Sequence, residues 1–357
     1  MKHTDTVMER KVTIKDIAKE AGVSVSLVSF VMNDSPDKEG RYRYRVNQQT
    51  RERIKGIAER MGYMPNTFAR GLRGGPTLVV GAVLPDISNP FYGEISRLLE
   101  GMCAERGYTL LIGSTDENVE NMKRIVNSFM SKMVDGFIIV PCEGGESVLE
   151  DVTSRKIPCV IIDRRVEGIP APRILLDNKA VMRDAVSLLY RAKGIREIEM
   201  ISYSLRVTSI MEREEGYLEV MKNLGLGSFA KVHRVDFHDT QSQTMDIMPS
   251  IIQRGTKALV FATNSLTISA IKALTSLGAT IQKDIFIVGT DNSDVYDIFR
   301  PAIPHIEQPL QEICEKAMGS LFSIMDGTAP QEEGEELVEG VMVFPGMKSE
   351  ESSLNEC

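Results

Sequence analysis

From Leu78 onward, short runs of apolar residues alternate with segments whose apolar residues recur at helical spacing. The apolar runs cover residues 78–84, 108–112, 136–140, 158–162, 173–176, 198–202, 258–262 and 286–289. Strands that are apolar on both faces are typical of parallel sheets covered by helices on both sides. Because these strands are too many for one compact unit of this length, the pattern predicts an α/β fold with two doubly wound, parallel-sheet lobes.

Polar and aromatic residues gather where these strands end, which is where open α/β sheets bind ligands. The residues at the strand ends and in neighbouring segments are Asn89, Phe91, Tyr92, Asp163, Arg164, Arg213, Phe237, Asn264, Asp291 and Gln308. Carboxylates and amides hydrogen-bond the hydroxyl groups of a sugar, and aromatic rings cover its C–H face. Each Asp or Asn alone could simply cap the following helix, but together they favour a sugar-binding cleft.

Two short helices joined by a tight turn are predicted near the N-terminus, over residues 13–33. Thr13 and Asp16 form a capping-box pattern at the start of the first helix, and Gly22 suits the left-handed conformation that ends it. Ser24 can cap the second helix. This is the pattern of a helix-turn-helix, which lays its second helix in the major groove of DNA. An ordinary helical hairpin would give a similar pattern without DNA binding.

The distribution of charge supports DNA binding by the N-terminal part. The 357 residues carry a net charge of −8, which taken globally argues against nucleic acid. Residues 1–75, however, hold 15 Lys and Arg against 9 Asp and Glu, whereas the remainder holds 27 against 41. A small basic module on a larger acidic body is expected when only the N-terminus contacts DNA phosphates. A third helix predicted over residues 48–61 and a basic, Gly- and Pro-containing linker complete this module.

The composition gives little support to other classes of function. The five cysteines are odd in number and lack a Cys-x-x-Cys pair, so neither disulfides nor a metal site is expected. The four histidines have no evident nucleophile partner, and no phosphate-binding Gly-rich motif is present. An apolar leader and a membrane-spanning stretch are lacking, which favours a cytoplasmic protein. We expect no catalytic residues and no cofactor; the alternatives are a stand-alone sugar-binding protein and an α/β enzyme.

The order of these features resembles the lactose-repressor (LacI) family of bacterial transcription regulators. The matching elements are the helix-turn-helix, the Pro65-Asn66 pair, the Pro-Asp-Ile-Ser-Asn-Pro-Phe loop and the Asp-Arg, Arg-x-x-Gly, Asn and Gly-x-Asp strand ends, and they span Val12 to Phe344. The resemblance implies a body similar to the periplasmic sugar-binding proteins, with a ribose-type site formed by the ten cleft residues named above. It also implies three partners: double-stranded operator DNA, a pentose-like monosaccharide or derivative, and a second copy of the chain.

For the DNA-binding site, the resemblance implies contacts from the helix-turn-helix, the loop after it and the linker. The residues are Thr13, Ser24, Val25, Ser26, Ser29, Phe30, Arg41, Arg43, Arg45, Asn66, Arg70, Leu72 and Arg73. Val25, Ser26 and Phe30 occupy base-facing positions, and none of them can make the bidentate contact by which Arg reads guanine. We therefore expect A·T pairs opposite them, unless Phe30 turns inward as a core residue.

Two further expectations concern the loop and the linker. Leu72 corresponds to the family's leucine that wedges into the minor groove. The arginines at 41, 43 and 45 either contact phosphates or belong to a solvated insertion. The sequence departs from the family pattern at Leu27 and Phe30 in the recognition helix, at Ser265 and in the length of this loop, and it lacks a tetramerising coiled coil.

The predicted organisation is a helix-turn-helix domain over 11–65, a hinge helix or linker over 66–77, a body over 78–347 and a tail over 348–357. Within the body, lobe 1 comprises residues near 78–176 and 307–337, and lobe 2 residues near 177–306 and 338–347. Effector binding is expected to close the two lobes and so change operator binding. Whether the effector releases or recruits DNA stays open.

Overall fold

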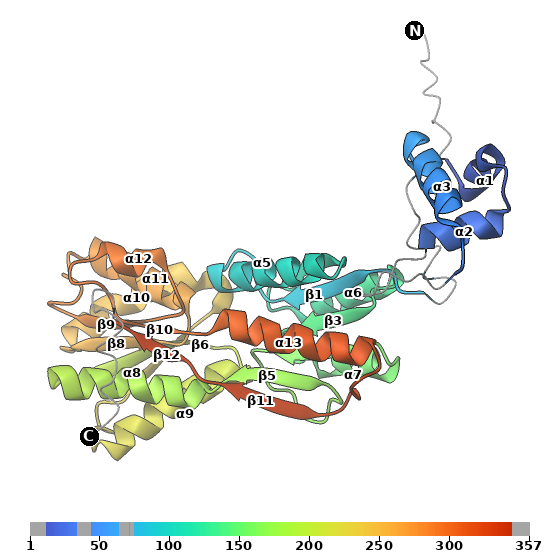
Figure 1. Ribbon diagram of the computed structural model, residues 1–357. Helices are drawn as coiled ribbons and strands as arrows, with labels where there is room; N and C mark the ends of the chain where they lie inside the picture. Colours follow the sequence, from blue (N-terminus) through green and yellow to red (C-terminus); the bar gives the residue numbers. More distant parts are fainter. Residues whose placement is uncertain (1–11, 34–43, 64–70, 72–74, 345–357) are drawn as a thin grey trace, which may run out of the picture. The chain divides into compact units, whose positions relative to one another are not determined.

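The computed structural model describes residues 12–33, 44–63, 71 and 75–344, and the chain forms two compact units, residues 1–77 and 78–357 (Figure 1). The small unit consists of helices and the large unit of helices and two sheets. No helix within the described ranges is long and apolar enough to cross a membrane.

The small unit contains α1 (Ile14–Ala21), α2 (Val25–Asn33) and α3 (Gln48–Arg60). The predicted capping box is confirmed at α1, where the backbone N–H and the hydroxyl of Thr13 both donate to Asp16 Oδ2, at 2.9 and 2.6 Å. Gly22 ends α1 in the left-handed conformation at φ 63°, as predicted. Ser24 Oγ accepts from the Leu27 N–H at 3.1 Å and caps α2. These local bonds fix the turn between α1 and α2.

All three helices contribute to one apolar core. Its buried members are Ile17, Ala18, Ala21, Val28, Val31, Ile54, Ile57 and Ala58. Arg51 of α3 is also buried, and its guanidinium donates to the Tyr44 carbonyl oxygen at 3.1 Å. This bond fastens the segment before α3 to the helix, so Tyr44 and its neighbour Arg45 have a defined place beside the core.

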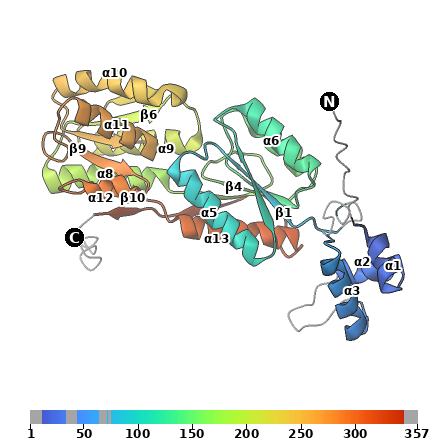
Figure 2. The same ribbon diagram turned by 90° about the horizontal axis from the view of Figure 1, so that it is seen from above.

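Lobe 1 of the large unit is built on a six-stranded, fully parallel sheet with the order β11-β5-β4-β3-β1-β2 (Figures 1 and 2). The strands are β1 (Val79–Leu84), β2 (Thr109–Ser114), β3 (Gly136–Ile139), β4 (Cys159–Ile162), β5 (Pro172–Leu176) and β11 (Gly334–Val338). One face packs against α5 (Pro90–Glu105) and α13 (Leu310–Met325), and the other against α6 (Val119–Ser131) and α7 (Glu146–Ser154). Both faces are therefore covered, as the apolar runs predicted.

Lobe 2 has a second six-stranded sheet with the order β12-β10-β9-β8-β6-β7, in which β12 alone runs antiparallel to its neighbour. Its strands are β6 (Ile198–Tyr203), β7 (Val232–Val235), β8 (Ala258–Phe261), β9 (Phe286–Thr290), β10 (His305–Glu307) and β12 (Val341–Val343). Its helices are α8 (Asn178–Lys193), α9 (Thr208–Asn223), α10 (Thr240–Gln253), α11 (Asn264–Ser276) and α12 (Asp294–Ile298), with a 3-10 turn η1 (Phe237–Asp239).

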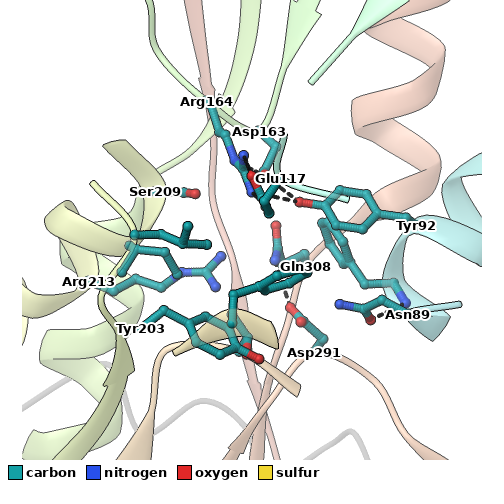
Figure 3. A pocket seen from close by; sticks show the side chains of 15 residues that line it. Asn89, Tyr92, Glu117, Asp163, Arg164, Tyr203, Ser209, Arg213, Asp291 and Gln308 are labelled. Atoms are coloured by element: carbon teal, nitrogen blue, oxygen red, sulfur yellow. Dashed lines mark hydrogen bonds and ion pairs between the residues drawn. The ribbon is translucent and has the colours of Figure 1, made fainter. Parts of the chain in front are cut away.

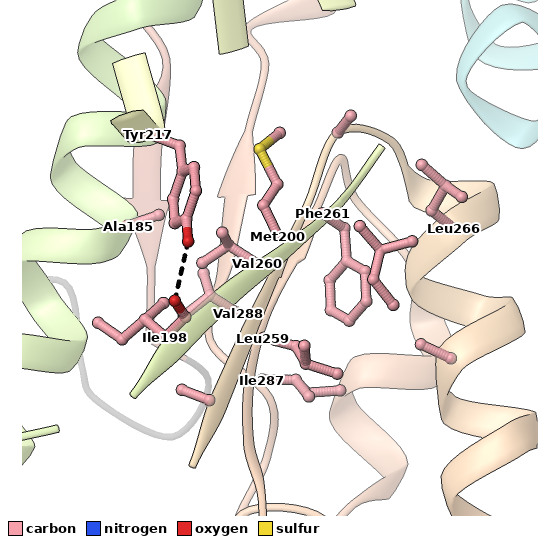
Figure 4. Packing of buried hydrophobic residues seen from close by; sticks show 14 of the residues in the cluster. Ala185, Ile198, Met200, Tyr217, Leu259, Val260, Phe261, Leu266, Ile287 and Val288 are labelled. Atoms are coloured by element: carbon pink, nitrogen blue, oxygen red, sulfur yellow. Dashed lines mark hydrogen bonds between the residues drawn. The ribbon is translucent and has the colours of Figure 1, made fainter. Parts of the chain in front are cut away.

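The core of lobe 2 shows why its strands lack the alternation of polar and apolar residues. Successive side chains of a strand point to opposite faces of the sheet. In β8, Leu259 and Phe261 lie on the side of α11, whereas Val260 lies on the side of α8 and α9 (Figure 4). Tyr217 of α9 completes the second side, and its hydroxyl donates to the Ile198 carbonyl oxygen at 2.8 Å. Every position of such a strand is buried and has to be apolar.

Three short segments connect the lobes. The chain crosses after β5 at Asp177, between β10 and α13 at residues 308–309, and between β11 and β12 at residues 339–340. The first and third crossings lie side by side, since the Asp177 N–H donates to the Val338 carbonyl oxygen at 3.0 Å. Each lobe is thus assembled from separate stretches of sequence, and the crossings are the places about which the lobes can rotate.

Candidate functional site

A cavity lies between the two lobes, at the carboxyl ends of strands from both sheets (Figure 3). It is lined by Asn89, Phe91, Tyr92, Glu117, Asp163, Arg164, Tyr203, Leu205, Ser209, Ile210, Arg213, Phe237, Thr263, Asp291 and Gln308. Nine of the ten predicted effector residues belong to this lining, and the tenth, Asn264, does not. The structure therefore brings together side chains that are up to about 220 positions apart in the sequence.

Two aspartates hold equivalent places in the two lobes. Asp163 is the first residue after β4 and Asp291 the first after β9, and both adopt the left-handed conformation, at φ 68° and 62°. Asp163 Oδ2 accepts from the Tyr92 hydroxyl at 3.0 Å, and Asp291 Oδ1 accepts from Gln308 Nε2 at 2.7 Å. This conformation is costly for residues other than glycine and is found at functional sites. Each lobe thus presents one oriented carboxyl group to the cavity.

Arg213 of α9 is anchored inside lobe 2. Its Nε donates to Asn178 Oδ1 at 2.8 Å and its Nη1 to the Ala262 carbonyl oxygen at 2.5 Å. Asp291, whose charge it faces, also belongs to lobe 2. Arg213 and Asp291 therefore lie on the same side of the cavity, so a pair between them does not fasten one lobe to the other.

Aromatic rings from both lobes line the cavity. Phe91 and Tyr92 of α5 meet edge to face with ring centroids 4.9 Å apart. Across the cavity, Tyr203 and Phe237 make a second such pair at 5.6 Å. Aromatic faces beside carboxyl groups suit a ring that is apolar on its faces and polar at its edge.

Asn264 supports the site without lining it. The residue is buried, and its Nδ2 donates to the Asn292 carbonyl oxygen at 3.3 Å. Its backbone N–H lies 3.4 Å from Asp291 Oδ2, as a donor at the start of α11. Contact between Asn264 and the effector stays a prediction; in the structure its amide bonds protein groups next to Asp291.

Six lining residues were absent from the sequence prediction: Glu117, Tyr203, Leu205, Ser209, Ile210 and Thr263. Tyr203 ends β6 and Glu117 closely follows β2, so the rule that ligands bind at strand ends could have found both. Leu205, Ser209 and Ile210 come from the loop after β6 and the start of α9, where no polar or periodic signal singles them out.

The ionisable groups of the cavity are deeply buried. Burial raises the pKa of Asp291, while Arg213 and Gln308 act in the opposite direction. Burial also raises the pKa of the Tyr92 hydroxyl, and the neighbouring Asp163 raises it further. Tyr92 therefore stays protonated at neutral pH and can donate. The lining offers hydrogen-bond donors and acceptors, and in the described part of the chain no cluster of three or more His, Cys, Asp or Glu side chains could hold a metal ion.

The small unit presents a second candidate surface along α2. Val25 is 45% exposed and Phe30 is 40% exposed. Ser24 and Ser26, on either side of Val25 in the sequence, are exposed as well. Phe30 stacks on Tyr44 with ring centroids 4.3 Å apart and planes at 15°. Phe30 therefore does not turn into the core.

Of the other predicted DNA-binding residues, the structure describes three. Thr13 and Arg45 are exposed and Ser29 is half-buried. The remaining six lie outside the described residues: Arg41, Arg43, Asn66, Arg70, Leu72 and Arg73.

Comparison with known proteins identifies the family of the chain. Residues 80–296 match the periplasmic binding protein domain family, and residues 13–66 match the bacterial regulatory proteins of the lacI family. The ribose operon repressor of Halalkalibacterium halodurans is 30% identical over 307 residues, covering 84% of this chain and 86% of that protein. The chain belongs to the LacI family. It is a DNA-binding transcription regulator rather than an enzyme.

Other comparisons agree with membership of the LacI family. The transcriptional regulator RegA of Clostridium saccharobutylicum is 29% identical, with 88% of this chain and 92% of that protein covered. The Lac repressor dimer, solved with operator and the anti-inducer ONPF, superposes with a TM-score of 0.78 over 94% of this chain and 98% of the repressor chain. At 22% identity that likeness shows the shared fold of a LacI-family regulator.

Proposed function

We propose that this LacI-family regulator is a repressor whose binding to operator DNA is controlled by a small, sugar-like effector held between the two lobes. The observation that carries the proposal is the pair of strand-end carboxyl groups, Asp163 and Asp291, one from each lobe. A ligand with several hydroxyl groups can donate to both at once and so favours the closed arrangement of the lobes.

A pentose-like monosaccharide or a derivative is the effector that we propose. Phe91, Tyr92 and Phe237 supply aromatic faces, and Asn89 and Gln308 supply amides for hydroxyl groups. The similarity to a ribose operon repressor supports this choice.

For DNA, we propose that α2 enters the major groove with Val25, Ser26 and Phe30 toward the bases. Two copies of the chain would place two such helices on successive half-sites. Leu72 and the arginines of the loop and linker are proposed contacts on the evidence of sequence alone. The effector acts through its different affinities for the DNA-bound and free conformations, which differ in the arrangement of the lobes.

The proposal predicts that Arg213→Ala and Asp291→Ala lose the effector response while the protein stays folded and binds operator. Each variant removes charge-assisted hydrogen bonds worth about 1.5–3 kcal/mol, so effector affinity should fall about tenfold or more. A thermal-shift screen of the wild type against monosaccharides identifies the effector, calorimetry measures its affinity, and a gel shift measures operator binding.

Asp246→Asn is the matched control, because Asp246 lies exposed on α10 away from the cavity. It should leave the effector affinity unchanged. Wild-type sugar affinity in both cavity variants would contradict the proposed site, and operator binding that ignores a bound sugar would contradict the proposed control.

A further inference from the structure

Both outer nitrogens of the Arg164 guanidinium are already bonded to protein oxygens. Its Nη1 donates to Glu117 Oε2 and to the Pro141 carbonyl oxygen, both at 2.8 Å. Its Nη2 donates to Glu117 Oε1 at 2.5 Å and lies 3.5 Å from the Tyr92 hydroxyl. Its Nε lies 3.5 Å from Asp163 Oδ2. An arginine in a ligand cavity often binds an anion through its two outer nitrogens. Here both outer nitrogens are taken by protein oxygens, and Nε is buried and makes no hydrogen bond.

Glu117 is the residue that occupies Arg164. Its side chain is 2% exposed, and it takes both outer nitrogens of the guanidinium in a bidentate pair (Figure 3). Displacing it would leave a buried carboxylate without a partner, which is strongly unfavourable. A phosphate or carboxylate that entered the cavity could therefore replace Glu117 at Arg164 only at a large cost in free energy.

The charges around the cavity also oppose an anion. The lining carries the carboxyl groups of Glu117, Asp163 and Asp291 against the guanidinium groups of Arg164 and Arg213. A hydroxyl group can donate to these carboxyl oxygens, whereas a phosphate or carboxylate is repelled by them. Repulsion of the wrong ligand is as effective a source of specificity as attraction of the right one.

We propose that Glu117 sets the charge of the effector: by occupying Arg164, it makes the cavity accept uncharged sugars and polyols and reject sugar phosphates and sugar acids. This inference rests on the proposed function of the same cavity. It goes beyond it by naming the class of effector and the residue that selects it. The competing interpretation is that Glu117 only neutralises Arg164 and leaves Arg213 free to hold an anionic group.

The first experiment needs no variant. Calorimetry on the full-length wild type compares D-ribose with D-ribose 5-phosphate, and D-glucose with D-glucose 6-phosphate and D-gluconate. For each neutral sugar that binds, its anionic counterpart should bind at least about tenfold more weakly. An anionic counterpart that binds as tightly as the neutral sugar, or more tightly, overturns the proposal.

The second experiment uses inorganic phosphate as the probe and does not depend on finding the sugar. Glu117→Gln keeps the size of the side chain and one acceptor but removes the charge. Phosphate should raise the melting temperature of this variant in a saturable way, and the double variant E117Q/R164Q should lose that gain. The matched control is Glu120→Gln, which removes an exposed carboxylate three positions away. The control and the wild type should show only the weak, non-saturating effect of salt.

The two experiments separate the failure of this inference from the failure of the proposed function. If no neutral sugar binds the wild type, the sugar effector is wrong, and the phosphate titration still decides the role of Glu117. Saturable phosphate binding by the wild type, or no gain in Glu117→Gln, overturns the inference even where a neutral sugar binds. Where Glu117→Gln fails to fold, the comparison of neutral and anionic sugars on the wild type decides it.

Discussion

Phe30 shows how one side chain can be ordered and yet exposed. A large aromatic residue on a short helix is usually buried, but the core of the small unit is filled by residues such as Val28 and Ile54. Phe30 instead stacks on Tyr44, and the backbone carbonyl of Tyr44 accepts a hydrogen bond from the buried Arg51. The stack orients the ring at the surface, so that Phe30 can meet thymine methyl groups at little further cost in side-chain entropy.

Replacing Phe30 by arginine should change the operator sequence. Phe30→Arg introduces a side chain that can contact guanine O6 and N7 together, a contact worth about 1–3 kcal/mol of discrimination. A selection from random DNA should give A·T-rich half-sites for the wild type and a new guanine in each half-site for the variant. Glu59→Gln, at an exposed position of α3 outside the predicted DNA contacts, serves as the control and should leave the selected sequence unchanged. A guanine-rich wild-type motif, or one that does not move on substitution, would show that Phe30 does not face the bases.

The helices and strands differ in how far the sequence specified them. The central strands β1, β3, β4, β8 and β9 are buried at nearly every position, so their composition alone predicted them. The strands β7, β10, β11 and β12 were not predicted. They are edge strands or only three residues long, and β11 is exposed at four of its five positions. These strands are held in place by pairing with a neighbouring strand, and such pairing leaves no apolar pattern in the sequence.

The residues of the site likewise differ in how far the sequence could predict them. Asp163 and Asp291 could be predicted because each lies within two residues of the end of an apolar run, where the rule about strand ends applies. Ser209 and Ile210 could not, because they lie in the first turn of α9 rather than directly after a strand. The pairing of Glu117 with Arg164 likewise depends on how two loops of lobe 1 are folded against each other, which the residue types alone do not reveal.

Two helical glycines should respond in opposite ways to substitution by alanine, because one lies in the close packing of α8 against α9 and the other in open space. A Cβ at Gly216 of α9 would lie 2.7 Å from the Lys179 carbonyl oxygen of α8, which is backbone and cannot swing away. Gly216→Ala should therefore destabilise the protein by about 1–3 kcal/mol. Gly319 of α13 has open space in the same position, so Gly319→Ala should stabilise it by up to ~1 kcal/mol through helix propensity. Urea denaturation measures both. Equal effects of the two substitutions would contradict the packing argument.

The two lobes are joined by polar contacts as well as by the three crossings. Arg165, in the lobe 1 loop after β4, forms an ion pair with Glu212 of α9, and its backbone N–H donates to Thr208 Oγ1 at 2.7 Å. Glu212 also accepts from Asn178 Nδ2 at 3.1 Å, and Asn178 in turn holds Arg213 at the cavity. A chain of hydrogen bonds thus runs from the cavity to the facing lobe.

Glu212→Gln should lower effector affinity by weakening this contact between the lobes. A partly exposed ion pair contributes at most about 1 kcal/mol, which corresponds to a loss of ~5-fold in affinity. Calorimetry with the neutral sugar that binds the wild type measures it. The control is Glu214→Gln on the same helix as Glu212, which breaks a pair with Arg234 of β7 inside lobe 2. If both variants lower the affinity equally, contact between the lobes is not the reason.

Because the chain crosses between the lobes three times, lobe 1 cannot complete its fold until late in synthesis. The lobe 1 strands β1 to β5 leave the ribosome first, but α13, which covers one face of their sheet, begins only at Leu310. All of lobe 2 except β12 is translated in between, which takes on the order of 10 s at the usual ~5–20 residues per second. Throughout that interval the apolar side chains of Ile138, Val160 and Ile174 lack the contacts that α13 later provides. Nascent chains paused at this stage should bind chaperones strongly, and release should follow the emergence of α13.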